Sequence, residues 1–356
     1  MIDARIGKRF PAAAGSSPFS LDVHFETSAA TTAFFGPSGA GKTLILDSIA
    51  GFVKPDSGRI LLDDQIVFDA QAQVNVRPQA RRCGYVFQNY ALFPHMTLRE
   101  NLLFAGARMN RLERHRRVAE MLERFRLTDV AGRRPHEVSG GQKQRCSIAR
   151  ALVGSPRVLL LDEPSRGLDA PLRNELYAIV RELRSEFGTP ILLVTHSLRE
   201  CFELADEMII VRDGAIVQSG APADVCEQPQ NLELARLLGI YNILPVEIRA
   251  LDPSRNSSLL RFENSDIEGE YYPGRLNGDR VHLLVAPQQL RARPKTGSPK
   301  RNEIAARLVR GIVTPNSIRM EFEGGLQSET RPGEFTPDPH NKEYWIEFPT
   351  RGLRIL

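Results

Sequence analysis

The sequence lacks any apolar run long enough to cross a membrane. Its longest runs, Val158–Leu161 and Ile191–Val194, fall far short of the ~20 residues that a transmembrane helix needs. The first residues have no apolar core behind their charges, so we expect no signal peptide there. No basic block dominates the net charge of +4, and we interpret Arg81–Arg82 and Arg133–Arg134 as solvated surface. We therefore expect a cytosolic chain that binds no nucleic acid and reaches a membrane only through partners.

Cysteine is scarce as well, with four residues in a chain of 356. They are Cys83, Cys146, Cys201 and Cys226, and no pair has the spacing of a metal site or a redox motif. We interpret all four as reduced and structural. The chain is too long for one ordinary domain, and its composition is that of a globular protein with ample core.

Eight consecutive residues, Gly36–Thr43, match the phosphate-loop pattern G-x-x-x-x-G-K-[ST] in full. Glycines allow backbone amides, rather than side chains, to face phosphate oxygens. Lys42 is expected to neutralise the outer phosphates and Thr43 to offer its hydroxyl to Mg²⁺, while the following helix directs its positive dipole end at the same anion. The pattern predicts a nucleoside triphosphate as ligand. The predicted contacts are Gly36, Pro37, Ser38, Gly39, Ala40, Gly41, Lys42 and Thr43.

The pattern of apolar and polar residues changes twice along the chain. From residue 21 to about 220, short apolar strands alternate with helical periods, which is typical of a layered α/β domain with buried parallel strands. Apolar residues at helical spacing predict a helical insert within residues 101–135. From residue 242 onward, short alternating segments between Gly, Pro and Asn indicate a small all-β domain. The predicted domains are 1–235, with a helical part at about 95–150, and 236–356.

The apolar strand Val158–Leu161 runs directly into two carboxylates. In a parallel sheet the ligand lies beyond the carboxyl ends of the strands. Asp162 is therefore expected to help hold Mg²⁺, directly or through water. Glu163, the next residue, is expected to polarise the attacking water as general base.

A second anion site is predicted at Val138–Arg145. Ser139 has the hydroxyl of an N-cap, and the two glycines after it let backbone amides approach an anion where a helix begins. This segment closely resembles the signature sequence of ABC-type ATPases. In that family two cassettes pair head to tail, and each signature covers the γ-phosphate held by the partner's loop. The resemblance implies an ATP-bridged homodimer, with contacts from Ser139, Gly140, Gly141 and Gln142.

Three more residues fit the same family pattern in order, and the fold it implies is the P-loop ABC cassette with a helical subdomain. Gln88 is in the place of the family's Gln loop, which reaches Mg²⁺ or the water and links to membrane subunits. His196 matches the switch histidine near the γ-phosphate. Asp169 matches the aspartate that crosses the dimer interface.

The chain departs from the family pattern in three places. Leu44 follows Thr43 where the family usually has a second hydroxyl residue, so one phosphate contact is missing. Arg166 stands where serine is common, and we expect it to contact phosphate or the partner chain. The aromatic residue that stacks on adenine is assigned to Phe10. Phe19, behind it, alternates with apolar residues and is interpreted as core.

The stretch Leu92–Asn101 resembles the region after the Gln loop in bacterial importer ATPases, where the coupling helix of the permease docks. We expect an exposed apolar patch of Leu92, Phe93 and Met96 as that dock. The alternative is packing of a loop onto the helical insert. The segments 237–242 and 281–290 resemble parts of the C-terminal accessory domain of these importers, an oligonucleotide-binding-like (OB-like) barrel.

The resemblance implies an ATP-hydrolysing importer subunit at the cytoplasmic face of the bacterial inner membrane. It works with a separate permease and, indirectly, an external solute-binding protein. Segment 68–70, the loop from there to Arg81–Arg82, and segment 237–242 look most like the molybdate and sulfate group. Molybdate or a related oxyanion is therefore the expected substrate, and polyamine, ferric iron and sugar are alternatives. A soluble ABC ATPase acting on ribosomes or DNA is disfavoured by the single cassette and the lack of a heptad run. A third alternative is a nearly silent ATPase whose β domain binds a ligand.

Overall fold

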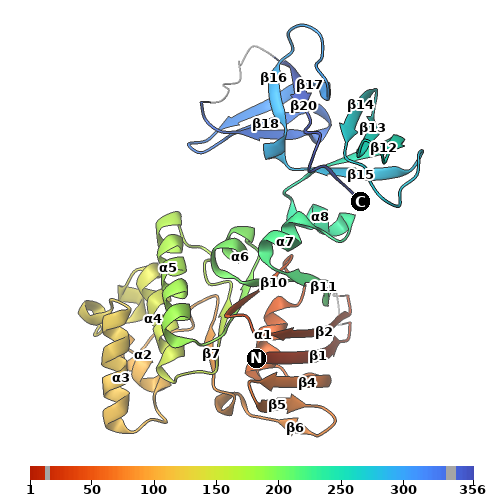
Figure 1. Ribbon diagram of the computed structural model, residues 1–356. Helices are drawn as coiled ribbons and strands as arrows, with labels where there is room; N and C mark the ends of the chain where they lie inside the picture. Colours follow the sequence, from red (N-terminus) through yellow and green to blue (C-terminus); the bar gives the residue numbers. More distant parts are fainter. Residues whose placement is uncertain (13–16, 334–341) are drawn as a thin grey trace. The chain divides into compact units, whose positions relative to one another are not determined.

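The computed structural model describes residues 1–12, 17–333 and 342–356, which form two compact units, Met1–Gln228 and Pro229–Leu356 (Figure 1). The first unit contains a six-stranded sheet in the order β11-β10-β3-β9-β8-β7. The strands from β10 to β7 are parallel to one another, and β11 is antiparallel to β10. The bounds are β3 Thr31–Phe35, β7 Cys83–Val86, β8 Val158–Asp162, β9 Ile191–Thr195, β10 Glu207–Arg212 and β11 Ala215–Gly220.

Every residue of β3, β8 and β9 is buried, which explains their continuous apolar sequences and confirms the expected α/β class. The carboxyl ends of these strands meet at one edge of the sheet. Helix α1, Lys42–Ala50, begins at that edge, directly after the loop that follows β3. The edge is therefore where ligand-binding side chains come together.

A second, antiparallel sheet covers the same core and was not foreseen from the sequence. Its order is β2-β1-β4-β5-β6, and burial in β2 alternates along the strand, so one face is apolar. Ile6 and Val23 of this sheet share a core cluster with Ile45 of α1 and Leu160 of β8. The bounds are β1 Ile2–Phe10, β2 Phe19–Thr27, β4 Ser57–Leu62, β5 Gln65–Asp69 and β6 Val74–Asn75.

The predicted helical insert contains α2 (Leu98–Ala105), α3 (Arg111–Arg124) and α4 (Gly140–Val153). Thr97 and Glu100 form a reciprocal capping box at the start of α2. In α3 the buried residues are Val118, Met121 and Leu122, as their helical spacing predicts. The remaining helices of this unit are α5 Ala170–Phe187, α6 Leu198–Leu204 and α7 Pro222–Glu227.

Arg81 is completely buried, so its interpretation as solvated surface was wrong. Its guanidinium lies at the end of α1 and takes the place of water for the last carbonyls of that helix. It donates to three backbone carbonyls and one amide oxygen, those of Ser48, Ile49, Val76 and Asn75. Burial lowers the pKa of Arg81. Arg82 and Arg133–Arg134 are exposed, as expected.

The second unit begins with α8, Leu232–Leu238, and continues as two five-stranded antiparallel sheets around one core, which confirms the expected small all-β, OB-like domain. One sheet has the order β14-β13-β12-β15-β21 and the other β16-β20-β17-β18-β19. The bounds are β12 Asn242–Asp252, β13 Ser257–Phe262, β14 Ser265–Gly269, β15 Arg280–Val285, β16 Arg291–Pro294, β17 Glu303–Val313, β18 Ile318–Phe322, β19 Gln327–Thr330, β20 Glu343–Glu347 and β21 Arg354–Ile355.

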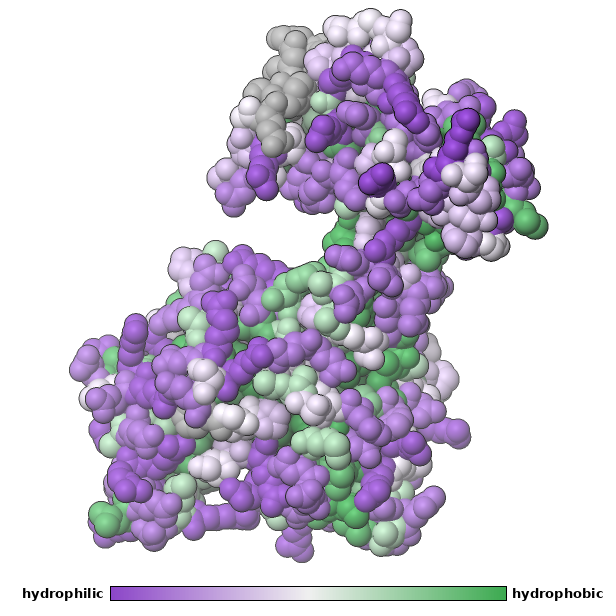
Figure 2. All heavy atoms as spheres, viewed as in Figure 1, coloured by the Kyte–Doolittle hydropathy of each residue, from purple (hydrophilic) through white to green (hydrophobic). Residues whose placement is uncertain are grey.

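Hydrophilic side chains cover most of the face of each unit that Figure 2 presents, with apolar residues in small patches. Among the described residues, no helix is long and apolar enough to span a bilayer. Burial raises the pKa of the Cys83 and Cys146 thiols to about 12, which is consistent with structural roles for these two cysteines.

Candidate nucleotide site

The phosphate loop joins β3 to α1, and its glycines are required by space as well as by conformation. A Cβ on Gly36 would lie 2.1 Å from the Val211 carbonyl oxygen. Gly41 has φ +99°, and a Cβ there would lie within 3.0 Å of the Phe19 and Leu21 side chains. The loop therefore packs against the core at Gly36 and Gly41, while Ser38 and Gly39 at its tip are exposed.

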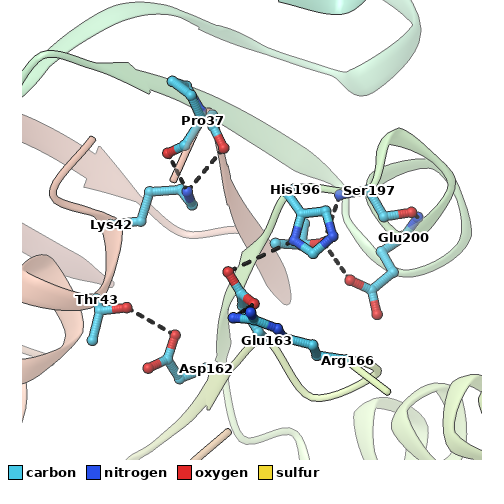
Figure 3. A network of polar contacts seen from close by, with 11 residues as sticks. Pro37, Lys42, Thr43, Asp162, Glu163, Arg166, His196, Ser197 and Glu200 are labelled. Atoms are coloured by element: carbon cyan, nitrogen blue, oxygen red, sulfur yellow. Dashed lines mark hydrogen bonds and ion pairs between the residues drawn. The ribbon is translucent and has the colours of Figure 1, made fainter. Parts of the chain in front are cut away.

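Lys42 is held by the loop that it follows. Its Nζ donates to the carbonyls of Gly36 and Pro37, at 2.8 Å each, and the residue is 5% exposed (Figure 3). Burial lowers the pKa of Lys42, while the nearby carboxylates of Glu163 and Asp162 raise it. The ammonium is thus a positive charge fixed at the mouth of the loop.

Thr43 and Asp162 meet between α1 and β8. The Thr43 hydroxyl donates to Asp162 Oδ1 at 3.0 Å (Figure 3). Burial raises the pKa of Asp162, the Thr43 hydrogen bond lowers it, and the charges of Glu163 and Asp47 raise it further. Hard oxygen donors gathered beside several carboxylates are the donor set that Mg²⁺ prefers, so these residues fit the ion.

Glu163 and His196 follow adjacent strands, β8 and β9. Glu163 has φ +44°, a left-handed conformation that is uncommon outside glycine, and its N–H donates to the Val194 carbonyl at 3.0 Å. Its Oε1 lies 3.6 Å from His196 Nδ1. The carboxylate side chain is 12% exposed and the imidazole 59% exposed. The strained backbone thus turns Glu163 toward the histidine at the ligand-binding edge.

Arg166 contacts both Glu163 and Gln88. Its Nη1 lies 3.0 Å from Glu163 Oε2. With the Gln88 amide oriented to satisfy its hydrogen bonds, its oxygen accepts from Arg166 Nε and Nη1 at 3.1 and 2.6 Å. The sequence marks Arg166 as a departure from the family, but these two contacts could not be foreseen from it.

A cavity of about 510 Å³ adjoins the phosphate loop. Phe10 and Phe19 contribute to one wall, and their ring centroids are 6.4 Å apart. Phe10 is 36% exposed, whereas Phe19 packs partly buried against the core, so Phe10 is the better placed to receive a base. Leu44 lines the cavity and also packs against the core, which makes this wall apolar. Gln88, Glu163 and Arg166 also line the cavity.

The signature residues do not line this cavity within the described part of the chain. Ser139 caps α4: its Oγ accepts from the Gln142 N–H at 3.3 Å, and Gln142 Oε1 accepts from the Ser139 N–H at 2.9 Å. Asp169 caps α5 by accepting from the Leu172 N–H at 3.1 Å. The single chain therefore places Ser139–Gln142 and Asp169 at helix starts, away from the phosphate loop's cavity.

Asp47 is a site residue that the sequence analysis missed. The Tyr85 hydroxyl donates to Asp47 Oδ1 at 2.9 Å, and burial raises the pKa of Asp47. Asp47 follows Thr43 by four residues on α1, so both side chains lie on the same helix face. That spacing was the signal available in the sequence.

The segment after Gln88 differs from expectation. Leu92, Phe93 and Met96 are half-buried rather than exposed. The side chain of Asn101 is completely buried; it accepts from the Phe93 N–H at 2.8 Å and donates to carbonyls of the same segment. An apolar groove of about 830 Å³ lies beside this segment, with Phe87, Phe93 and Phe104 among its walls.

A phosphate loop on a parallel sheet, with an acidic strand end beside it, defines the class of P-loop nucleoside triphosphatases. Residues 21–166 match the family described as ABC transporter. The solved dimeric ATP-binding cassette MJ0796, bound to ADP and Pi, superimposes with a TM-score of 0.54 and 28% identity, covering 62% of this chain and 99% of that one.

Curated relatives extend the similarity. The chain is 43% identical to the spermidine/putrescine import ATP-binding protein PotA of Nitratidesulfovibrio vulgaris, over 72% of this chain and 68% of that protein. It is 38% identical to PotA of Vibrio cholerae, over 80% of this chain and 75% of that protein. It is 37% identical to the molybdenum import ATP-binding protein ModC of Rhodospirillum rubrum, over 67% of this chain and 65% of that protein. The chain belongs to the ABC transporter family, as an ATP-binding, ATP-hydrolysing subunit of the importer type, which confirms the predicted family and enzyme class.

Proposed function

We propose that this chain binds MgATP in the cavity beside the phosphate loop and hydrolyses it to drive uptake of a small solute. The observation that carries the proposal is the convergence of Lys42, Thr43, Asp162, Glu163 and His196 on one edge of the sheet. A fixed cation, a hard-oxygen pair and a carboxylate beside a histidine are the groups that phosphoryl transfer to water requires.

Each group has a proposed role. The loop amides and Lys42 bind the phosphates, Thr43 and Asp162 hold Mg²⁺ together with Gln88, and Phe10 stacks on adenine. Bound Mg²⁺ neutralises charge that develops on the phosphates. Glu163 accepts the proton of the attacking water as the water oxygen bonds to the γ-phosphorus and the bond from that phosphorus to ADP breaks, and His196 donates to the γ-phosphate.

A homodimer is proposed because the cavity lacks the signature residues. The start of α4 is a helix N-terminus where Ser139 is exposed and Gly140 half-buried, which suits an anion supplied by a second copy. In this arrangement Ser139, Gly140, Gly141 and Gln142 complete the partner's phosphate site, and Asp169 lies at the shared interface. The dimeric state of the solved cassette supports this proposal.

The permease is proposed to dock on the apolar groove beside Phe93. Asn101 fixes the backbone of this segment, so the groove is preformed rather than assembled on contact. Docking there places the chain at the cytoplasmic face of the bacterial inner membrane, where an external solute-binding protein acts on it only through the permease.

We propose a polyamine as the transported solute, in place of the oxyanion expected from sequence. Similarity to PotA of Vibrio cholerae extends over 80% of this chain at 38% identity, whereas similarity to the molybdenum protein extends over 67% of this chain. An alignment over 80% of this chain is longer than the first unit, Met1–Gln228, so it includes part of the β-rich unit. Molybdate is the alternative substrate, and an uptake experiment must distinguish it from a polyamine.

Glu163→Gln tests the hydrolytic assignment. Phosphate release by the purified subunit is expected to fall by about 10²-fold or more, because the variant keeps the shape of the side chain but cannot take a proton. Light scattering with MgATP is expected to report an accumulated dimer. Glu123→Gln, an exposed change on α3, is the matched control and should leave both readouts unchanged. Undiminished hydrolysis by Glu163→Gln would overturn the assignment.

Uptake separates the two solutes. Cells that carry this subunit with its permease are given labelled putrescine, spermidine or molybdate. Polyamine uptake that disappears in the Glu163→Gln strain supports the proposal. Uptake of molybdate alone, lost in the same strain, would replace polyamine by the oxyanion.

A further inference from the structure

Arg166 contacts the two residues that the proposed reaction depends on most directly. Its guanidinium lies 3.0 Å from Glu163 Oε2 and donates twice to the Gln88 oxygen. Figure 3 shows Arg166 beside the Glu163 carboxylate, whose other oxygen faces His196. Arg166 also lines both the cavity at the phosphate loop and a second cavity, of about 390 Å³, that includes His196.

The backbone of Glu163 is fixed, so only its side chain can change conformation. The N–H is bonded to β9 and φ is held at +44°. The carboxylate side chain is 12% exposed, whereas that of Arg166 is 57% exposed. A pair that is open to water on one side is weak, so a competing anion or a shift of Gln88 can release it.

The segment that follows Gln88 is hydrogen-bonded to α4, the helix that begins with the signature residues. Tyr90 and Ala91 have φ of +59° and +47°, and their carbonyls accept from Ser147 and Arg150 of α4. These hydrogen bonds connect the segment that bears Gln88 to α4. A displacement of α4 or of the neighbouring groove therefore moves the Gln88 side chain, and with it the partner of Arg166.

We propose that Arg166 is a positioning residue that holds Glu163 and Gln88 together. It keeps the carboxylate of the general base paired, and so unable to accept a proton from water, until the Gln88 segment moves. This inference rests on the function proposed above. The guanidinium occupies carboxylate lone pairs that would otherwise accept the proton of water, and it occupies the Gln88 oxygen that would face Mg²⁺. Hydrolysis therefore requires both contacts to open together, which makes turnover dependent on the segment beside the permease groove.

Arg166→Ser removes both contacts, because a serine side chain ends far short of either partner. The kcat of the isolated subunit for ATP is expected to rise about two- to fivefold, with KM for ATP little changed, since exposed contacts of this kind shift equilibria by about that factor. Arg166→Lys supplies a single point charge in place of the planar fork and is expected to fall between wild type and serine. Arg116→Ser, an exposed arginine on α3, is the control.

A second readout does not depend on turnover. Hydrogen–deuterium exchange of residues 87–91, measured without nucleotide, is expected to accelerate in Arg166→Ser and to stay unchanged in Arg116→Ser. Unchanged exchange, or a kcat equal to or below that of wild type, would overturn the positioning role. A wild-type subunit that releases no phosphate would instead overturn the proposed function, and the exchange measurement would still decide the contact.

Discussion

The hydroxyl of Thr43 and the carboxylate of Asp162 lie in hydrogen-bond contact at 3.0 Å, although 119 positions separate them in the sequence. Thr43 lies in the first turn of helix α1, and Asp162 ends strand β8. The contact brings the phosphate loop and the acidic strand end into a single site, because helix α1 begins and strand β8 ends at the same edge of the parallel sheet.

Thr43→Val removes the hydroxyl and keeps the volume of the side chain. The Mg²⁺ concentration for half-maximal ATP hydrolysis is expected to rise about tenfold, because one oxygen of the proposed ion site is lost. Thr43→Ser keeps the hydroxyl and is the control. A Mg²⁺ titration in which valine and serine behave alike would contradict the assignment.

Asp162 is expected to destabilise the protein at neutral pH when no Mg²⁺ is present. Burial raises the pKa of this carboxyl above its ordinary value of 3.8, so the folded chain holds the proton more tightly than the unfolded chain. Its contribution to stability is complete below pH 3.8 and is lost as pH rises through the higher folded pKa. Asp162→Asn should therefore raise the Tm at neutral pH, with a difference that shrinks toward pH 4. Thermal melts across this range in EDTA measure the effect, and a constant difference would refute it.

Phe10→Ala tests the stacking role. Loss of one aromatic stack, worth about 0.5–1.5 kcal/mol, is expected to raise the Kd for ATP about three- to tenfold while kcat stays near wild type. Phe10→Trp should preserve affinity. Leu112→Ala, an exposed apolar residue on α3, is the control. Equilibrium binding of ATP is the measurement, and an alanine variant with unchanged Kd would assign the base elsewhere.

Arg81→Met is expected to lower the free energy of unfolding by about 3 kcal/mol or more. The change leaves buried carbonyls at the end of α1 without donors, and each such loss costs about 1–3 kcal/mol. The neighbouring Arg82 is exposed, so Arg82→Met should change stability by less than about 0.5 kcal/mol. Urea denaturation compares the two. Equal effects would mean that burial of Arg81 does not matter for stability.

Local sequence patterns predicted several of the secondary-structure elements. The buried strands β8 and β9 follow from their apolar runs, and the buried face of α3 follows from the spacing of Val118, Met121 and Leu122. The antiparallel sheet of β1, β2 and β4 was not foreseen, because its register depends on pairings such as Arg5 with Arg59, far apart in the chain. The alternation of apolar and polar residues within one strand does not show which other strand it pairs with.

By itself, the sequence determined the chemistry of this protein: the phosphate loop at Gly36–Thr43 and the carboxylates at Asp162 and Glu163 are contiguous motifs whose residue types already imply their ligands. Only the tertiary structure decided how that chemistry is arranged. It buried Arg81 within a set of carbonyls and placed Arg166 between Glu163 and Gln88. The reason is that a charged side chain looks the same in every sequence, whereas its partners are set by the elements that packing brings beside it.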